Sequence, residues 1–244
     1  MWTRSLLAFL WPLVLGLGAL QGLRDHRSKT AELLTSTPRP PWHRAVALLG
    51  TTALTLVTGF ALLIVAGGVQ VLAGGAYQHL GWVPISLVAT LSLVAAAALG
   101  MGLGRTLPSA FTPSALTPPA LTPPALTVAA FVFVSLLRTA EGPAVPTPAV
   151  PNRLALLSPV VAQVREVRLT LSASVHLGQT LGLLGVAATG FALLAAVTTR
   201  GRLLALAPVL AGAVLALLVL PSDPRRTYVV DRAAAAMVCE DRSA

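Results

Sequence analysis

The sequence predicts an all-α polytopic membrane protein with about six transmembrane helices, and three observations lead to this fold class. Of the 244 residues, 55% are hydrophobic and only 10% are charged, whereas soluble proteins carry about 25% charged residues. Six long stretches contain no charged residue. Six spans of about 20 residues each would take up roughly half of the chain and leave only loops outside the membrane.

Five of the spans follow directly from uncharged apolar stretches of sufficient length. They are predicted at residues 6–23, 45–72, 82–104, 172–198 and 203–220. A helix rises about 1.5 Å per residue, so each stretch can cross a hydrocarbon core of about 30 Å unaided. The first stretch is followed by basic residues instead of a small-residue cleavage pattern, so we interpret it as a retained span and not as a signal peptide.

The fourth span, predicted at residues 116–137, needs a separate argument. Its apolar part, residues 125–137, would rise only about 20 Å as a helix, so residues upstream have to complete the crossing. Those residues repeat the sequence Ala-Leu-Thr-Pro, which can enter a bilayer because it is uncharged but interrupts a helix at each proline. We interpret the repeat as low-complexity sequence and not as a binding motif.

The loop at residues 24–44 determines the predicted orientation in the membrane. It holds five basic residues and two acidic ones, and short loops rich in arginine and lysine stay in the cytoplasm. Counting spans from this loop places the loop at residues 138–168 and the tail at residues 221–244 outside. The division of the chain is therefore a transmembrane domain at residues 1–220 and an external tail.

Several classes of site are disfavoured by the residues that the sequence lacks. A single cysteine, Cys239, rules out a Cys-rich metal site, and the four histidines are scattered, so we predict no metal and no cofactor. The chain has neither a nucleophile elbow, a zinc-peptidase helix nor a phosphate-binding loop. We therefore predict that the chain is not an enzyme and has no catalytic residues.

The distribution of charge argues against two further classes. All eight acidic residues lie outside the predicted spans, so no carboxylate is placed to relay a proton, and an ion-driven carrier is disfavoured. The arginines form short clusters beside apolar stretches and not one continuous basic face, so no nucleic-acid partner is predicted. The spans also contain few polar residues, and we therefore expect a transport path to lie between two subunits.

Glycines recur in the span at residues 172–198, at positions 178, 182, 185 and 190. Small residues let two helices approach closely in a membrane, where lipid provides no hydrophobic drive for association. Two interpretations remain open: packing against another helix of the same subunit, which we favour, or contact with a second subunit.

The cytoplasmic loop contains a short predicted helix. Thr30 can cap its amino terminus, Glu32 lies in the first turn where the helix dipole favours an acid, and prolines after residue 37 end it. Leu33 and Leu34 form an apolar knob. Because so short a helix is not stable alone, it has to dock on headgroups, on the spans or on a partner protein.

This loop resembles the first cytoplasmic loop of actinobacterial ABC transporter permeases of the type-two exporter class. The resemblance lies in Arg-Asp-x-Arg at residues 24–27, x-Thr-x-Glu-Leu-Leu at 29–34, x-Ser-Thr-Pro at 35–38 and Trp-x-Arg at 42–44. After the third span, the sequence Gly-Arg-Thr-Leu-Pro-Ser at residues 104–109 is similar to the Gly-Arg-x-x-Pro-Ser turn of the same permeases.

The resemblance implies a multi-pass permease subunit in the bacterial plasma membrane. Such a subunit couples ATP hydrolysis by a separate cytoplasmic ATP-binding subunit to substrate export, and it acts with a second permease subunit as a homodimer or heterodimer within the lipid bilayer. Members of the family have an additional amino-terminal span and continue further outside, so a short or truncated form is expected. The alternative is a non-transporting membrane scaffold or a degenerate permease remnant.

The loop residues expected to dock on the ATP-binding subunit divide into two groups. The first caps the short helix or forms its apolar knob, and the second makes polar contacts or holds the loop at the headgroups. In order, they are Thr30, Glu32, Leu33 and Leu34, then Arg24, Arg27 and Arg39.

Overall fold

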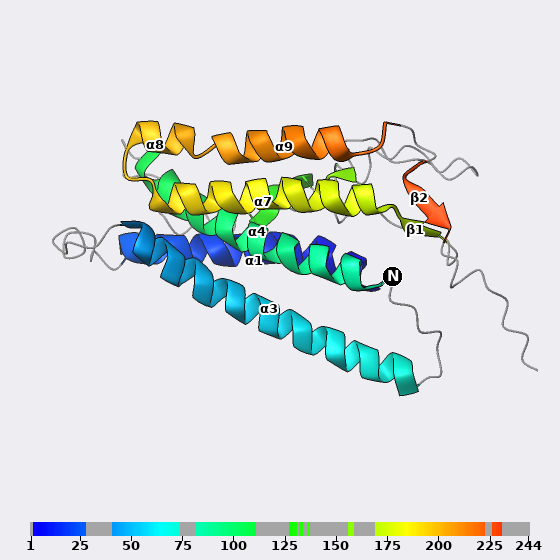
Figure 1. Ribbon diagram of the computed structural model, residues 1–244. Helices are drawn as coiled ribbons and strands as arrows, with labels where there is room; N and C mark the ends of the chain where they lie inside the picture. The colour runs from blue at the N-terminus through cyan, green and yellow to red at the C-terminus, as the bar shows by residue number, and fades with distance from the viewer. Residues whose placement is uncertain are drawn as a thin grey trace, which may run out of the picture.

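The computed structural model describes residues 2–27, 41–73, 82–110, 127–130, 132–133, 136, 156–158, 169–222 and 226–230. In these ranges the chain forms a bundle of long apolar helices with a small two-stranded sheet at one end (Figure 1). Five helical segments among the described residues are long and apolar enough to cross a membrane. The predicted all-α polytopic membrane fold is therefore confirmed.

Four single helices cover the predicted spans at residues 6–23, 45–72, 82–104 and 172–198. They are α1 (Trp2–Arg27), α3 (Pro41–Ala73), α4 (Trp82–Ala110) and α7 (Ala173–Ala195). Each helix except α7 extends several residues beyond its predicted apolar stretch.

The last span differs from the continuous helix predicted at residues 203–220. The structure divides it into α8 (Thr199–Leu204) and α9 (Ala207–Val219), with a turn between them. Pro208 follows the turn and has no N–H to donate to the preceding turn of helix. The N–H of Val209 donates instead to Thr189 Oγ1 of α7 at 2.9 Å, so a buried hydroxyl of the neighbouring helix satisfies the interrupted backbone.

The helices run in two directions. Leu7 and Ala8 pack against Ala89 and Leu93 near the start of α4, and Gly22 lies against Met101 further along it, so α1 and α4 are parallel. By the same test α7 is parallel to α4, whereas α3 and α9 run the opposite way (Figure 1). Because α4 and α7 are parallel, the chain between them has to return along the bundle.

The fourth predicted span, at residues 116–137, would provide this return, but most of it lies outside the described residues. The described part is helical at residues 127–130. Ala130 packs with Leu15 of α1 and Ala96 of α4, so this part lies against the seam between these two helices. The span itself remains a prediction.

Glycines bring the backbones of α1 and α4 into contact. A Cβ atom added to Gly18 would lie 2.5 Å from the carbonyl oxygen of Ala97, and one added to Gly22 would overlap the backbone of Met101. On the other helix, Gly100 and Gly104 lie in the same way against the backbone of α1. The pair is therefore held by close backbone packing of the small-xxx-small kind.

The glycines predicted to matter in α7 also pack inside the chain. Gly190 lies against the backbone of Ala98 in α4, and Gly185 lies against Gly212 in α9, where an added Cβ would be 3.0 Å from the Cα of Gly212. Gly182 is less constrained, since its nearest neighbour would be a Leu157 methyl group at 3.7 Å. The interpretation as packing within the subunit is thus confirmed at Gly185 and Gly190.

Helix α3 is the least packed of the long helices. Only 6% of the residues in its apolar window are buried, against 50% in that of α1 and 56% in that of α4. Phe60 and Ala45 contact the bundle, while an added Cβ at Gly50, Gly59 or Gly67 would meet nothing within 4 Å. Figure 1 shows α3 departing from the other helices toward its carboxyl end.

A small sheet and a buried polar contact lie at the end of the bundle where α7 begins and α9 ends. Strand β1 (Leu169–Leu171) pairs antiparallel with β2 (Tyr228–Val230), with Leu169 opposite Val230. Gln179 is fully buried and donates from Nε2 to the carbonyl oxygen of Leu156 at 2.9 Å. Described parts of the predicted external loop and tail thus pack on the same end of the bundle.

Candidate functional site

One end of the bundle is basic. The carboxyl ends of α1 and α4, the amino end of α3 and helix α8 meet there, on the left in Figure 1. They bring together Arg24, Arg44, Arg105, Arg200 and Arg202. Such an end is typical of the cytoplasmic side of a membrane protein.

Most of the predicted docking residues lie outside the described residues. These are Thr30, Glu32, Leu33, Leu34 and Arg39, all within residues 28–40, which join α1 to α3 at the basic end. Arg24 is exposed on α1, and Arg27 is the last residue of that helix. The helix at Thr30 and the docking role of these residues therefore remain predictions.

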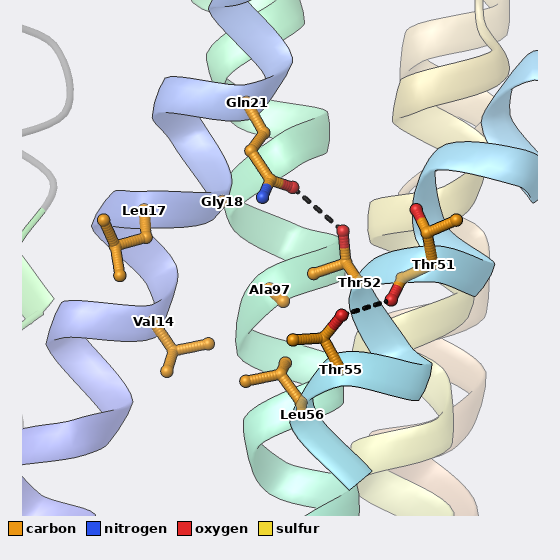
Figure 2. A pocket seen from close by; sticks show the side chains of 9 residues that line it. All are labelled: Val14, Leu17, Gly18, Gln21, Thr51, Thr52, Thr55, Leu56 and Ala97. Carbon is orange, nitrogen blue, oxygen red and sulfur yellow. Dashed lines mark hydrogen bonds between the residues drawn. The ribbon is translucent and has the colours of Figure 1, made fainter. Parts of the chain in front are cut away.

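A groove of about 240 Å³ lies between the two helices that this loop connects. Figure 2 shows its walls, which are α1 on one side and α3 on the other, with α4 behind. Its polar lining consists of Gln21, Thr51, Thr52 and Thr55, and its apolar lining consists of Val14, Leu17, Gly18, Leu56 and Ala97.

The close contact of α1 with α4 forms the floor of the groove. Gly18 has no side chain to fill the space beside α3, and it brings α1 onto Ala97, which also lines the groove. Helix α3 lies across this seam and meets α1 through a polar contact, because Thr52 Oγ1 is 2.9 Å from Gln21 Oε1. This hydrogen bond joins the two walls.

The threonines of α3 are held by their own helix. Thr51 Oγ1 donates to the carbonyl oxygen of Ala47 at 3.0 Å, and Thr55 Oγ1 donates to that of Thr51 at 2.9 Å (Figure 2). Thr52 Oγ1 also lies 2.9 Å from the carbonyl oxygen of Leu48. Bonds of this kind let threonine occupy an apolar helix without an unsatisfied hydroxyl proton.

The amino-acid composition alone does not indicate this groove. The low polar content of the spans led to the expectation that a transport path lies between two subunits. That expectation stays a prediction, and the groove shows only that four polar side chains of the spans lie together. A signal was available in the hydroxyls at positions 51, 52, 55 and 58, because residues three or four apart share one face of a helix. These hydroxyls alone do not show which helix packs against them, and the structure identifies it as α1 through Gln21.

Metal chemistry finds no support in the described part of the chain. No group of three or more histidine, cysteine, aspartate or glutamate side chains there could hold a metal ion.

Comparisons with protein-family models, with curated proteins and with solved structures give no match.

Proposed function

We propose that the chain is the membrane-spanning permease subunit of an ATP-binding-cassette exporter in the bacterial plasma membrane. A separate cytoplasmic subunit hydrolyses ATP, and the chain provides the path for the substrate, together with a second permease subunit. One observation carries the proposal: residues 28–40, the predicted docking loop, connect the two helices that form the walls of the polar groove.

The packing of the helices suggests how movement of the loop would reach the groove. Helices α1, α4, α7 and α9 contact one another through glycines, whose backbone contacts leave no space for adjustment. Helix α3 is held by few buried side chains. A force applied to the loop would therefore displace α3 more readily than the other helices and change the width of the groove.

ATP binding and hydrolysis belong to the partner, and the chain contributes docking residues and a path but no catalytic group. Leu33 and Leu34 would supply the apolar contact with the partner, and Glu32 and the neighbouring arginines would supply polar contacts around it.

The proposal is tested by purifying the tagged chain in mild detergent from its native host and assaying ATPase activity in the eluate. We expect an ATP-binding subunit to co-purify with the wild type and to be lost from the variant Leu33→Asp, Leu34→Asp, because two carboxylates cannot be buried in an apolar contact without a large cost.

The matched control is Leu33→Met, Leu34→Met, which keeps the apolar volume and is expected to retain the partner. Recovery of the wild-type chain without any ATP-binding subunit would contradict the proposal and favour a non-transporting scaffold or a permease remnant. Equal recovery with the aspartate variant would show that the partner does not dock on these leucines.

A further inference from the structure

The α3 wall of the groove presents hydrogen-bond acceptors. The hydroxyl protons of Thr51 and Thr55 are donated to carbonyl oxygens of their own helix, at 3.0 and 2.9 Å. A hydroxyl oxygen that has given its proton still has lone pairs with which to accept. A molecule in the groove therefore has to bring its own donors to this wall.

The α1 wall presents a carboxamide. Gln21 Oε1 is engaged by Thr52, and Nε2 of the same side chain carries two N–H donors with no hydrogen-bond partner among the described residues. Together the two walls offer both acceptors and donors within one groove. Hydroxyl groups match such a lining, because each can donate to one wall and accept from the other.

The absence of charged side chains in the groove disfavours charged headgroups. No ionisable side chain is among the described residues that line the groove. Removing a charged group from water without a partner of opposite charge is costly, so phosphate and ammonium groups gain nothing in the groove to replace their hydration. An uncharged headgroup avoids this cost.

The depth of the groove in the membrane fits an amphiphile. Measured along α1 from Arg24, a rise of about 1.5 Å per residue places Gln21 about 5 Å and Val14 about 15 Å into the bilayer. Half of the hydrocarbon core is about 15 Å thick. Measured in the same way along α3 from Arg44, Thr51 lies about 11 Å and Thr55 about 17 Å deep. The groove thus lies within one leaflet, with Gln21 at its outer end and polar and apolar side chains side by side toward the midplane.

The size of the groove indicates how much of such a molecule it holds. Its volume of about 240 Å³ is smaller than the pockets of about 300–1,000 Å³ that enclose most of a drug-sized ligand. The groove can therefore take a headgroup and the first part of one chain, while the rest of the molecule stays in the lipid beside the poorly packed α3.

We infer that the groove between α1 and α3 binds an uncharged, hydroxyl-bearing amphiphile from the leaflet at the basic end of the bundle. Its hydroxyls bond to Gln21, Thr51, Thr52 and Thr55, and its chain lies against Val14 and Leu56. The inference rests on the proposed function only in treating this molecule as transported cargo.

The test uses the full chain in phosphatidylcholine nanodiscs with no ATP-binding subunit present. The probe is dodecyl glucoside with a photoreactive diazirine in its chain, and the comparison probe is dodecyl phosphocholine with the same diazirine. We expect the glucoside to label the peptides that contain Val14 and Leu56 several-fold more than the phosphocholine probe does. The double variant Gln21→Leu, Thr52→Val should lower this labelling about tenfold, the loss expected for two hydrogen bonds.

The matched control is Thr58→Val. Thr58 lies on the same helix and donates to the carbonyl oxygen of Leu54 at 2.8 Å, but it does not line the groove, so labelling should stay at the wild-type level. Gln21→Leu alone should give an intermediate loss, which guards against a misfolded double variant.

Equal labelling by the two probes, or unchanged labelling of the double variant, would overturn the inference. Because no ATP-binding subunit takes part, this result is independent of the co-purification experiment. If the wild-type chain shows no preference for the glucoside probe but co-purifies with an ATP-binding subunit, the ligand is rejected and the permease proposal stands. If the preference is present but no ATP-binding subunit co-purifies, the permease proposal is rejected and the ligand stands.

Discussion

At the scale of single residues, glycine determines which helices of this chain touch. Gly18, Gly100 and Gly190 lie against backbone atoms of a neighbouring helix, whereas Gly59 of α3 lies beside open space. A backbone atom cannot rotate away from an added methyl group as a flexible side chain can. The same residue type is therefore indispensable in the tight bundle and replaceable on α3.

This contrast gives a matched pair of substitutions. We expect Gly190→Val to lower the free energy of unfolding by about 3 kcal/mol, at the upper end of the cost of overpacking a core, because its side chain would overlap the backbone of Ala98. Thermal unfolding of the detergent-solubilised protein measures the change.

Gly59→Val is the control, and its effect should stay within about 0.5 kcal/mol, as for a surface substitution. Similar unfolding temperatures for the two variants would mean that the contact between α4 and α7 is looser than the structure describes.

At the scale of elements, α3 stands apart from the helices around it. Its apolar side chains are exposed along most of its length, with Leu54 at 66% and Leu62 at 70%, so lipid has to cover this helix on most sides. Elements with few buried contacts are the ones that move most readily. The groove and the connecting loop both adjoin this element.

We predict a wider range of positions for α3 than for α1, both measured relative to α4. Spin labels at Leu63→Cys in α3 and Leu87→Cys in α4, which are 63% and 66% exposed, report the first distance. Leu13→Cys in α1, 52% exposed, paired with the same α4 label, reports the second. Both pairs are made in a Cys239→Ser background.

Pulsed electron–electron double resonance in nanodiscs should give a broader distance distribution for the α3 pair, because α1 and α4 are fixed by backbone contact. Distributions of equal width would show that α3 is as firmly held as α1, and the coupling through α3 in the proposed function would then lose its physical basis.

At the scale of the whole molecule, the arrangement of charged helix ends predicts the orientation in the membrane. The end that gathers Arg24, Arg44 and Arg200 should face the cytoplasm. We expect Ser222→Cys, at the opposite end, to react with a membrane-impermeant maleimide in intact cells, and Val197→Cys to react only after permeabilisation.

Both positions are exposed and uncharged in the wild type, so the substitutions leave the arginines in place, and a Cys239→Ser background removes the native thiol. Labelling of Val197→Cys in intact cells, with Ser222→Cys protected, would reverse the orientation and place the loop at residues 28–40 outside the cell.

The sequence was sufficient for the fold class because a helix in a bilayer needs only length and apolar composition. It was insufficient where two distant segments have to meet. The hydrogen bond between Gln21 and Thr52 depends on how two helices pack together. The pairing of Leu169 with Val230 joins two strands that are about 60 residues apart in the chain. The interruption before Val209 was missed because Pro208 stands in an otherwise uniform apolar stretch.

The small sheet has a consequence for biosynthesis. Strand β1 precedes α7 and strand β2 follows α9, so their pairing joins the two ends of the segment that contains α7, α8 and α9. A ribosome has to complete Tyr228–Val230 before β1 can acquire its partner. In the predicted orientation, with the basic end in the cytoplasm, these residues also have to cross the bilayer first. The sheet can therefore form only after α7, α8 and α9 have been synthesised.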